Sequence, residues 1–468
     1  MIPARAPLLT EASSSLPRVD PRARAAAAGL GAIPAGQPVR LAKRTSNLFR
    51  ARRPASSELD LSSFAGVEVV DRARRRAVVG GLTTYEDLAS TTVQHGLVPL
   101  CVPQLRTITL GGAVTGLGIE AASFRNGCPH ESVTAMEILT GTGDVILATP
   151  DNEHRGLFFG FPNSYGSLGY ALRLEIELEP AAPYVRLRHL RQLNAATASD
   201  TIARIVADRA WQGTAVDYLD GTVFGPGSIV LTLGTYTDRP DQVPSDYTGR
   251  HIYYKSLNQR PHDVLSMEDY LWRWDTDWFW CSRAFGAQNP LIRTVWPRRY
   301  LRSDAYWKLV ALDRRFDVAD RISAARGLPP RERVVQDIEV PLSRLEEFLS
   351  FFHEQVGISP VWICPLQQRD PDRRWPLYEF EAGTTYVNVG FWSTVPRPDG
   401  HPEDGRVNRL IEDEVTRLDG RKSLYSTAYY SREQFDALYG GARYAALKSR
   451  YDPQGRFPDM YSKTVGGA

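Results

Sequence analysis

The sequence predicts an α+β fold, and three patterns between residues 103 and 179 carry this prediction. A glycine-rich segment covers 103–127, a hairpin signal lies at 141–144, and residues 172–179 alternate between apolar and charged side chains. The glycine-rich segment is not enclosed by the strand–helix–strand unit of doubly wound folds. With 468 residues, the chain is long enough for two domains with separate cores.

The elements expected before the glycine-rich segment are short. Val67–Val70 and Ala77–Val79 are rich in valine and predict two strands. Thr84–Asp87 has the spacing of a capping box, which predicts a helix that ends near Gly96.

The glycine-rich segment predicts a loop that holds a phosphorylated cofactor. Its glycines fall within eight residues, at Gly111, Gly112, Gly116 and Gly118. Hydroxyl groups flank them at Thr107, Thr109 and Ser123. Glycines this dense let a backbone come close to a ligand, and consecutive amides in such a loop can form an anion-binding concavity. An ordinary turn between two strands is the alternative interpretation.

Further strands are predicted after this segment. Val133–Leu139 and Val145–Ala148 flank Gly141–Asp144, which is a hairpin signal. The alternation over 172–179 has a period of two and predicts a half-buried strand. Gly166–Tyr170, just before that strand, is a second tight glycine approach.

The second half of the chain mixes both kinds of element. Strands are expected at 228–233, 335–340 and 385–389, and helices at 342–352 and 406–417. Six of the ten tryptophans fall between Trp272 and Trp307. They indicate either an apolar tunnel for a long hydrophobic substrate or an aromatic core and domain interface. If the backbone around 272–280 is extended, some of these side chains should point away from the core.

Several motifs resemble a known group of flavoproteins. TITLGG at 107–112, the GDV turn at 143–145 and GSLGYALRLEIEL at 166–178 resemble the FAD-binding domain of the vanillyl-alcohol oxidase and p-cresol methylhydroxylase superfamily. Within it, the Δ24-sterol reductase (Diminuto-type) family is much more similar. The motifs that carry this resemblance are LGGAVTGLGIEAAS at 110–123, VVQDIEVP at 334–341, WICP at 362–365 and YSREQF at 430–435.

The resemblance implies a domain plan and a cofactor. We expect a two-part FAD-binding domain of the p-cresol methylhydroxylase type at 1–185, a mixed α/β substrate (cap) domain at 186–425, and a C-terminal return to the FAD domain at 426–468. The superfamily places its first pyrophosphate loop after a strand, here Val39–Leu41, which assigns cofactor binding to Arg44, Thr45, Ser46 and Asn47. The other implied cofactor-binding residues are Thr107, Thr109, Leu110, Gly111, Gly112, Thr115, Gly116, Gly118, Glu120, Ser123, Gly169 and Tyr170.

The first loop also predicts how the flavin is held. Superfamily members with covalent flavin usually carry a His in this loop or a Cys nearby, and this loop has neither. We therefore expect non-covalent FAD and no metal site. No second GxGxxG motif follows a strand, so the sequence itself does not indicate a nicotinamide site. NADPH as the electron donor is implied by the resemblance alone.

The resemblance implies the reduction of an isolated carbon–carbon double bond. Such a reaction needs a hydride from the flavin N5 and a proton from a cap residue. The candidates for the proton donor are Tyr429, with Lys255 as a cation that lowers its pKa, and Tyr254, Asp337 and Glu120. For each of them a structural role, as a hydrogen-bonded core residue or a solvated acid, is the alternative. An FAD-dependent oxidase or dehydrogenase of an alcohol is the alternative function, and a flavin-free lipid carrier is a third.

Composition limits the partners and the location. The net charge of +2 argues against a dedicated nucleic-acid binder. The apolar runs are too short to span a bilayer, and the four cysteines form no CxxC pair, which favours a reducing compartment. We expect a cytoplasmic protein. The first 60 residues hold ten basic and four acidic residues. The cluster of Arg40, Lys43, Arg44, Arg50, Arg52 and Arg53 indicates either pairing with the FAD pyrophosphate or peripheral contact with an anionic inner membrane surface. A solvated basic face is the alternative for Arg50, Arg52 and Arg53.

The basic residues indicate the source and hence the substrate. Only 6 of the 56 Lys and Arg residues are Lys, which is typical of a GC-rich bacterial genome. Most such bacteria make no sterols. We therefore expect a methylene-branched fatty acyl chain, reduced to the methyl-branched chain, rather than a sterol side chain. A methyltransferase that makes the methylene substrate would be a partner.

Overall fold

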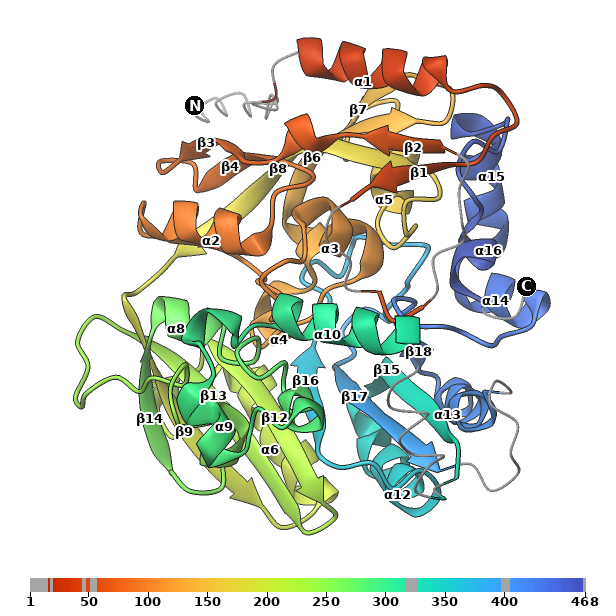
Figure 1. Ribbon diagram of the computed structural model, residues 1–468. Coiled ribbons are helices and arrows are strands. Elements are labelled where there is room, and N and C mark those ends of the chain that lie inside the picture. Colours follow the sequence, from red (N-terminus) through yellow and green to blue (C-terminus); the bar gives the residue numbers. More distant parts are fainter. Residues whose placement is uncertain are drawn as a thin grey trace, which may run out of the picture.

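Two β-sheets form the frame of the protein. The computed structural model describes residues 16, 20–43, 48–50, 57–316, 327, 329–396 and 405–465. The first sheet lies above the second in Figure 1, with α3, α8 and α10 between them. The last strand of the first sheet ends at Pro180, and the first strand of the second begins at Tyr184.

The first sheet has six strands in the described part of the chain, in the order β3-β4-β8-β6-β7 with β5 paired to β8. The strands are β3 (Val67–Asp71), β4 (Arg76–Gly80), β5 (Leu97–Pro99), β6 (Val133–Thr140), β7 (Val145–Ala148) and β8 (Gly169–Pro180). Their pairs are antiparallel. The helices around it are α1 (Pro21–Ala32), α2 (Tyr85–Val93), α3 (Leu110–Gly116), α4 (Ser123–Asn126) and α5 (Arg155–Gly160). A separate parallel pair, β1 (Val39–Ala42) and β2 (Ser57–Asp60), lies beside them.

The second sheet is antiparallel and has eight described strands in the order β14-β9-β13-β12-β16-β17-β15-β18. They are β9 (Tyr184–Gln192), β12 (Tyr218–Gly225), β13 (Ser228–Thr237), β14 (His262–Ser266), β15 (Arg331–Pro341), β16 (Val361–Leu366), β17 (Tyr386–Pro396) and β18 (Arg421–Lys422). A small hairpin pairs β10 (Ala210–Trp211) with β11 (Thr214–Ala215). One face packs on α6 (Ala195–Asp208), α12 (Leu345–Gln355) and α13 (Arg406–Arg417). α7 (Tyr253–Ser256) and α8 (Met267–Leu271) precede the Trp-rich segment at 272–307, which contains α9 (Pro290–Val295) and the start of α10 (Ser303–Phe316).

The C-terminal helices lie beside the first sheet (Figure 1). They are α14 (Arg432–Leu438), α15 (Gly441–Tyr451) and α16 (Met460–Thr464). Lys448 Nζ donates to the Ser167 carbonyl over 2.7 Å, and the Arg456 main-chain carbonyl accepts from Val39 N–H at 2.8 Å. The end of the chain therefore contacts both the β1 strand and the loop before β8.

The predicted strands and helices are confirmed where their pattern was regular. The 141–144 signal joins β6 to β7, and the expected helix at 406–417 is α13. Thr84 caps α2 by accepting from Asp87 N–H at 3.1 Å. The Asp87 carboxylate accepts from the Thr84 hydroxyl at 2.7 Å, so the cap uses the two side chains. Mixed α/β structure with a large antiparallel sheet is thus the observed class.

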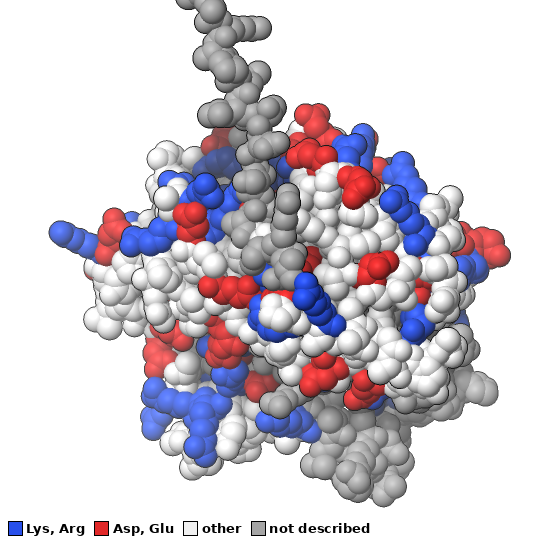
Figure 2. All heavy atoms as spheres, turned by 90° about the horizontal axis from the view of Figure 1, so that it is seen from above, with Lys and Arg blue, Asp and Glu red and all other residues white. Residues whose placement is uncertain are grey.

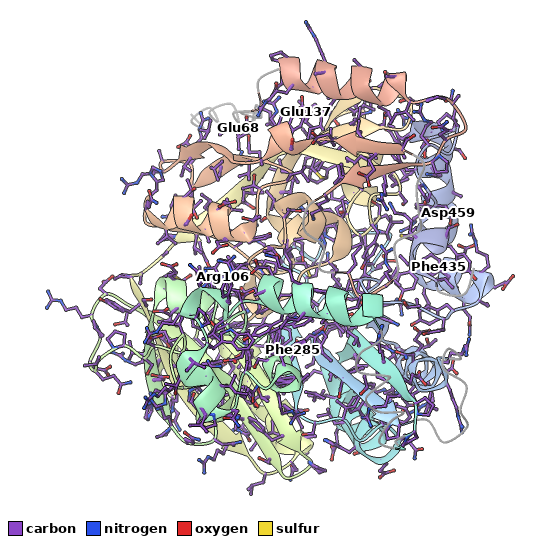
Figure 3. All side chains as sticks on the ribbon, in the orientation of Figure 1. Glu68, Arg106, Glu137, Phe285, Phe435 and Asp459 are labelled. Atoms are coloured by element: carbon purple, nitrogen blue, oxygen red, sulfur yellow. The ribbon has the colours of Figure 1, made fainter. Side chains whose placement is uncertain are left out.

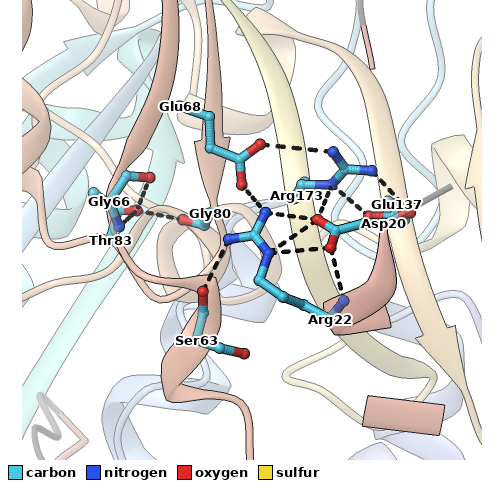
Figure 4. Close-up of polar contacts among 9 residues, drawn as sticks. All are labelled: Asp20, Arg22, Ser63, Gly66, Glu68, Gly80, Thr83, Glu137 and Arg173. Carbon is cyan, nitrogen blue, oxygen red and sulfur yellow. Dashed lines mark hydrogen bonds and ion pairs between the residues drawn. The ribbon is translucent and has the colours of Figure 1, made fainter. Parts of the chain in front are cut away.

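The expectation of a half-buried strand at 172–179 is wrong for most of its length. Arg173 and Glu175 are each only 1 % exposed, although they lie on the polar face. The Arg173 guanidinium lies 2.7 Å from Glu137, 3.5 Å from Asp20 and 3.6 Å from Glu68. Figure 4 shows these ion pairs meeting at the start of α1. β8 is the central strand, and charge pairing lets it bury both faces.

The Trp-rich segment is not extended. Trp272, Trp274, Trp278 and Trp280 are each at most 4 % exposed. Turns and short helices fold this stretch, and Trp278 and Phe279 adopt positive φ angles of 46° and 58°. The folded backbone lets all four indole rings face the interior, so the outward orientation expected for an extended chain does not arise.

Charged side chains join the two sheets at the Trp-rich segment. Arg106 lies at this junction in Figure 3. Its guanidinium is 3.0 Å from Glu86 on α2 and 5.0 Å from the centre of the Trp272 ring, and its main-chain N–H donates to Asp275. Glu86 also pairs with Arg302 at 2.7 Å. These contacts hold α2 and α10 together.

Within the described ranges, no helix is both long enough and apolar enough to cross a bilayer.

Candidate active site

A cavity of about 350 Å³ lies between the two sheets. One side is formed by β1, α3 and the loop before β8, and the other by residues of β15, β16 and β17 together with Trp278, Phe279 and Tyr425. Both sheets are needed to close it. Its size is in the range of small-molecule sites.

The glycine-rich segment reaches this cavity through α3. Thr109 caps the helix, because its Oγ1 accepts from Gly112 N–H at 3.2 Å. Lys43 Nζ donates to the same hydroxyl oxygen at 2.9 Å. The Gly111 amide donates to the Gly81 carbonyl at 2.9 Å, and a Cβ on Gly111 would lie 2.8 Å from that oxygen. Gly111 is therefore required for close packing against the chain after β4.

This geometry changes the expected role of the amides. The main-chain N–H groups of Gly111 and Gly112 donate within the protein, so they do not form the expected concavity for an anion. Cationic side chains take that place around the cavity. Lys43, Arg50 and Lys463 line it, and Lys463 Nζ donates to the Gly166 carbonyl at 3.0 Å. Lys43 and Arg50 belong to the N-terminal basic cluster, for which pairing with the FAD pyrophosphate was one of the two expected roles, whereas Lys463 was not predicted because it lies far away along the chain.

Eight of the twelve expected cofactor-binding residues that the structure describes line the cavity. These are Thr109, Gly111, Gly112, Thr115, Gly116, Gly118, Gly169 and Tyr170. Gly169 has φ +149°, and a Cβ there would lie 2.5 Å from the Leu139 carbonyl oxygen. The close approach expected at 166–170 is therefore made to β6.

Four expected cofactor-binding residues do not line the cavity. Leu110 is packed in the core at 1 % exposure. Ser123 Oγ accepts from Glu120 N–H at 3.0 Å, and the Glu120 carboxylate accepts from Ala122 N–H at 2.8 Å. Thr107 is buried outside the lining. Arg44, Thr45, Ser46 and Asn47 lie outside the described residues.

The described lining fits FAD. Its walls are mainly apolar and aromatic, which suits flat rings. Its cations suit a pyrophosphate. The described lining residues include neither His nor Cys, so this set offers no side chain of the usual types for a covalent flavin bond.

Asp337 is the acidic side chain among the described lining residues. It lies on β15, opposite Gly390 of β17. Burial raises the pKa of Asp337 to about 7, and the neighbouring Asn388 and Tyr425 side chains oppose part of this rise. Its Oδ1 has no hydrogen-bond partner among the described residues. A carboxyl group in this state can hold a proton near neutral pH and face a ligand.

Aromatic side chains surround this carboxyl group. Trp392 Nε1 donates to the Tyr425 hydroxyl at 3.0 Å. The Phe279 and Trp392 rings stack with centroids 4.3 Å apart, and Phe279 meets Trp362 edge-on at 5.5 Å. Tyr425 and Trp392 were not singled out from the sequence. Neither residue lies within one of the motifs that carry the family resemblance.

The other proton-donor candidates lie elsewhere. The Tyr429 ring packs on Arg409 of α13, with the guanidinium 5.0 Å from its centre. Tyr254 donates its hydroxyl to Gln288 at 2.7 Å, and Lys255 Nζ lies 5.9 Å above the Tyr254 ring. Burial raises the pKa of Glu120 to about 8, yet its carboxylate is turned to Ala122. None of the four lines the described cavity, and no contact places Lys255 beside Tyr429.

Of the six tryptophans at 272–307, Trp278 is the one among the described residues that line the cavity. Trp278, Phe279, Trp362 and Trp392 line the cavity. Trp274 is buried away from it, and its Nε1 donates to Asp220 at 2.9 Å. Part of the tryptophan set is therefore core, and part is cavity wall.

Comparison with known proteins agrees with this site. Residues 32–149 match the family described as FAD binding domain, and they contain β1, α2, α3 and β6. The chain is 26 % identical to the Delta(24)-sterol reductase of Homo sapiens, over 85 % of this chain and 76 % of that protein. It is 25 % identical to the Delta(24)-sterol reductase of Arabidopsis thaliana, over 89 % of this chain and 78 % of that protein.

A second type of enzyme is similar at the same level. Cytokinin dehydrogenase 4 of Oryza sativa subsp. japonica is 24 % identical, over 86 % of this chain and 78 % of that protein. The chain therefore carries an FAD binding domain and is a distant homologue of Δ24-sterol reductases over most of its length.

Proposed function

We propose that this protein is an FAD-dependent reductase of an isolated carbon–carbon double bond in a lipid. The observation that carries the proposal is a single cavity in which the glycine-rich segment faces Asp337 across apolar aromatic walls. Homology to FAD-linked oxidoreductases supports the cofactor and the class of reaction. In this proposal, the first sheet and its helices are a two-part FAD-binding domain of the p-cresol methylhydroxylase type, and the second sheet is the cap.

The cofactor is FAD, held without a covalent bond. Lys43, Arg50 and Lys463 would attract its pyrophosphate, and the α3 glycines leave room for it. Reduced FAD, when bound, supplies a hydride to one carbon of the substrate. NADPH is the proposed source of the electrons.

Asp337 is the proposed proton donor. An alkene has no carbonyl to accept electron density, so reduction places a hydride on one carbon and a proton on the other. A carboxyl group with a pKa of about 7 is partly protonated at neutral pH, and its position on β15 gives it access to the cavity. The pKa matches the operating pH, which favours general acid catalysis.

The proposed substrate is a methylene-branched fatty acyl chain, which becomes methyl-branched. Protonation of a 1,1-disubstituted methylene group gives tertiary cationic character, as does protonation of a trisubstituted sterol side chain. The same donor therefore serves both alkenes, and a sterol side chain is the other member of this substrate class. A methyltransferase that makes the methylene group would be a functional partner, at the cytoplasmic face of the membrane.

The similarity to a cytokinin dehydrogenase favours one alternative, an FAD-dependent oxidase or dehydrogenase. The test is anaerobic incubation of the purified protein and NADPH with a methylene-branched phospholipid, a Δ24-sterol or no lipid, followed by mass spectrometry of the extracted lipid. A gain of two hydrogens in the branched acyl chain is expected. Turnover of neither lipid, combined with fast reoxidation of the reduced flavin by air, would support the oxidase instead.

A further inference from the structure

Exposed apolar side chains are concentrated in one stretch of the chain, whose α9 and α10 parts are brought together by Trp296 and Tyr306, with ring centres 6.3 Å apart. Of the nine large apolar side chains exposed in the described part of the chain, five lie between 291 and 309. They are Leu291, Ile292, Val295, Tyr300 and Leu309, and we call this set the apolar patch. Leu291 is 82 % exposed and Val295 is 79 % exposed. Single exposed apolar residues are ordinary, but a cluster of them marks a contact surface.

The local structure fixes this orientation. Asn289 caps α9 by accepting from Leu291 N–H at 2.9 Å. Arg293, on the opposite face of α9, is 4 % exposed and pairs with Asp277 at 2.7 Å. Because Arg293 anchors the inner face, Leu291 and Val295 are held outward. Their exposure is a property of the fold.

The patch has a basic border. Arg283, Arg298, Arg299 and Lys308 belong to the same stretch and are exposed, and Arg298 pairs with Asp246 at 3.1 Å in a contact that is open to solvent on both sides. Asp304 is the one acidic residue between 283 and 309, and its carboxylate pairs with Arg302 at 2.8 Å. Arg299 lies 4.8 Å above the Tyr300 ring. Apolar side chains within a basic border are typical of surfaces that rest on anionic lipid.

Aromatic rings connect the patch to the cavity. Trp278 lines the cavity and stacks on Tyr306 of α10 with centroids 6.5 Å apart. Tyr306 in turn contacts Trp296 at 6.3 Å and Phe285 at 5.6 Å. Phe285 lies beneath α10 in Figure 3. The layer between the patch and the cavity is therefore largely aromatic, with the buried Arg293–Asp277 pair beside it.

We propose that the apolar patch docks on an anionic phospholipid bilayer, so that an acyl chain enters the cavity past the Trp278–Tyr306 layer. This inference rests on the proposed function for its substrate, and it names the surface that meets the membrane. The basic N-terminal region is less suited, because Arg50 is only 8 % exposed and the described residues among the first 60 include none of the exposed large apolar side chains. Acidic and basic groups also alternate on the face seen in Figure 2.

Vesicle flotation tests the docking surface without any turnover. The full chain is mixed with vesicles of equal parts phosphatidylglycerol and phosphatidylcholine, or of phosphatidylcholine alone. Leu291→Ser with Val295→Ser should lower partitioning onto the mixed vesicles by about ten-fold or more, since the variant loses two apolar side chains that enter the bilayer on docking. Arg298→Glu with Arg299→Glu should weaken binding to the mixed vesicles and remove most of its salt dependence.

Leu193→Ser with Val243→Ser is the matched control, since these residues are 79 % and 88 % exposed outside the patch. This control should bind as the wild type does. Unfolding midpoints equal to that of the wild type show that each variant is folded. Wild-type protein that does not bind, or a patch variant that binds normally, would overturn the proposal. A wild-type dimer that the patch variant converts to monomers would assign the patch to a second copy. Wild-type protein that binds the vesicles but reduces no alkene would refute the proposed function and would still support this surface as the docking site.

Discussion

The carboxyl group of Asp337 is the reactive group best placed for proton transfer. It lines the cavity, and its Oδ1 has no partner among the described residues. We predict that Asp337→Asn lowers turnover by about 10²-fold or more, the usual size of a general-acid contribution. The flavin spectrum should be unchanged, because Asn has nearly the same shape.

Tyr429→Phe is the comparison for this prediction. Its ring packs on Arg409 outside the described cavity lining, so its turnover should stay within about three-fold of the wild type. Stopped-flow measurement of flavin reoxidation by the alkene separates the two variants. Normal turnover in Asp337→Asn with a large loss in Tyr429→Phe would assign the role of proton donor to Tyr429, the first candidate from the sequence.

The pKa of Asp337 predicts the pH dependence of the reaction. The proton must be present for transfer, so kcat/KM should fall as the pH rises through about 7. The folded state holds this proton more tightly than the unfolded state, whose Asp pKa is about 3.8. The stabilising contribution of this group is therefore full below about 3.8 and is lost as the pH rises to about 7.

The Tyr425 side chain should help to set the pKa of Asp337. It opposes part of the rise in pKa that burial causes. Tyr425→Phe is therefore expected to raise the pKa of Asp337 further and to shift the falling limb of the kcat/KM profile to higher pH. Tyr254→Phe, whose hydroxyl contacts Gln288, is the control and should leave the limb in place. A falling limb at the same pH in Tyr425→Phe would mean that another group sets the profile.

Gly112 tests the cofactor end of the cavity. A Cβ there would lie 2.9 Å from Thr109 Oγ1 and 3.3 Å from Lys43 Nζ. We predict that Gly112→Val displaces these two side chains and gives a folded protein with little bound flavin. The absorbance of flavin per mole of protein measures this. Gly31→Val, where a Cβ has nothing within 4 Å, should retain full flavin.

Sequence patterns predicted the site residues that depend on local backbone geometry, but not those that the fold brings in from distant parts of the chain. The α3 glycines form a local signal, because the chain must pass closely by Gly81. Lys463 and Tyr425 join the site through long-range folding, and no local pattern marks them. Asp337 was one of several candidates, since the sequence does not show which acid faces a cavity and which, like Glu120, turns to its own backbone.

The β8 strand shows the limit of periodicity. Its alternating pattern correctly predicts a strand, but not that charge pairing buries its polar face. We predict that Arg173→Leu lowers the free energy of unfolding by about 3–5 kcal/mol, because Asp20 and Glu137 lose their buried partner. Urea unfolding monitored by fluorescence measures this.

An exposed ion pair gives the matched control for Arg173. Arg186 and Asp241 lie 3.2 Å apart with side chains 42 % and 62 % exposed. Arg186→Leu should therefore cost no more than about 1 kcal/mol. Equal losses in both variants would mean that the Arg173 network does not hold α1 to the sheet.

Caps and periodicity predicted the helices α2 and α13 correctly, whereas the conformation of the Trp-rich segment could not be predicted in this way. α13 matches the predicted 406–417, and α2 begins at the predicted cap. Residues 272–280 offer no period, because all their tryptophans are buried in turns. Their conformation depends on contacts such as Arg273 with Asp220 at 2.9 Å, which join distant parts of the chain.

The two sheets close the cavity only when they are together. Glu86 on α2 pairs with Arg302, and Arg106 contacts Asp275, while cavity residues come from both α3 and β15. A ligand in this cavity touches both parts and should stabilise them as a unit. Binding to the folded state alone adds about 4 kcal/mol when the ligand is at a thousand times its Kd.

Removal of FAD should therefore loosen both parts of the protein. We predict that the apoprotein unfolds several degrees below the holoprotein. In hydrogen exchange, FAD should increase amide protection in α3 and also in β15 and β17. Gly112→Val, treated with the same FAD concentration, should gain neither. If the flavin protects α3 but leaves β15 and β17 unchanged, then the second sheet does not contact the cofactor, and the placement of Asp337 beside the reacting atoms fails with it.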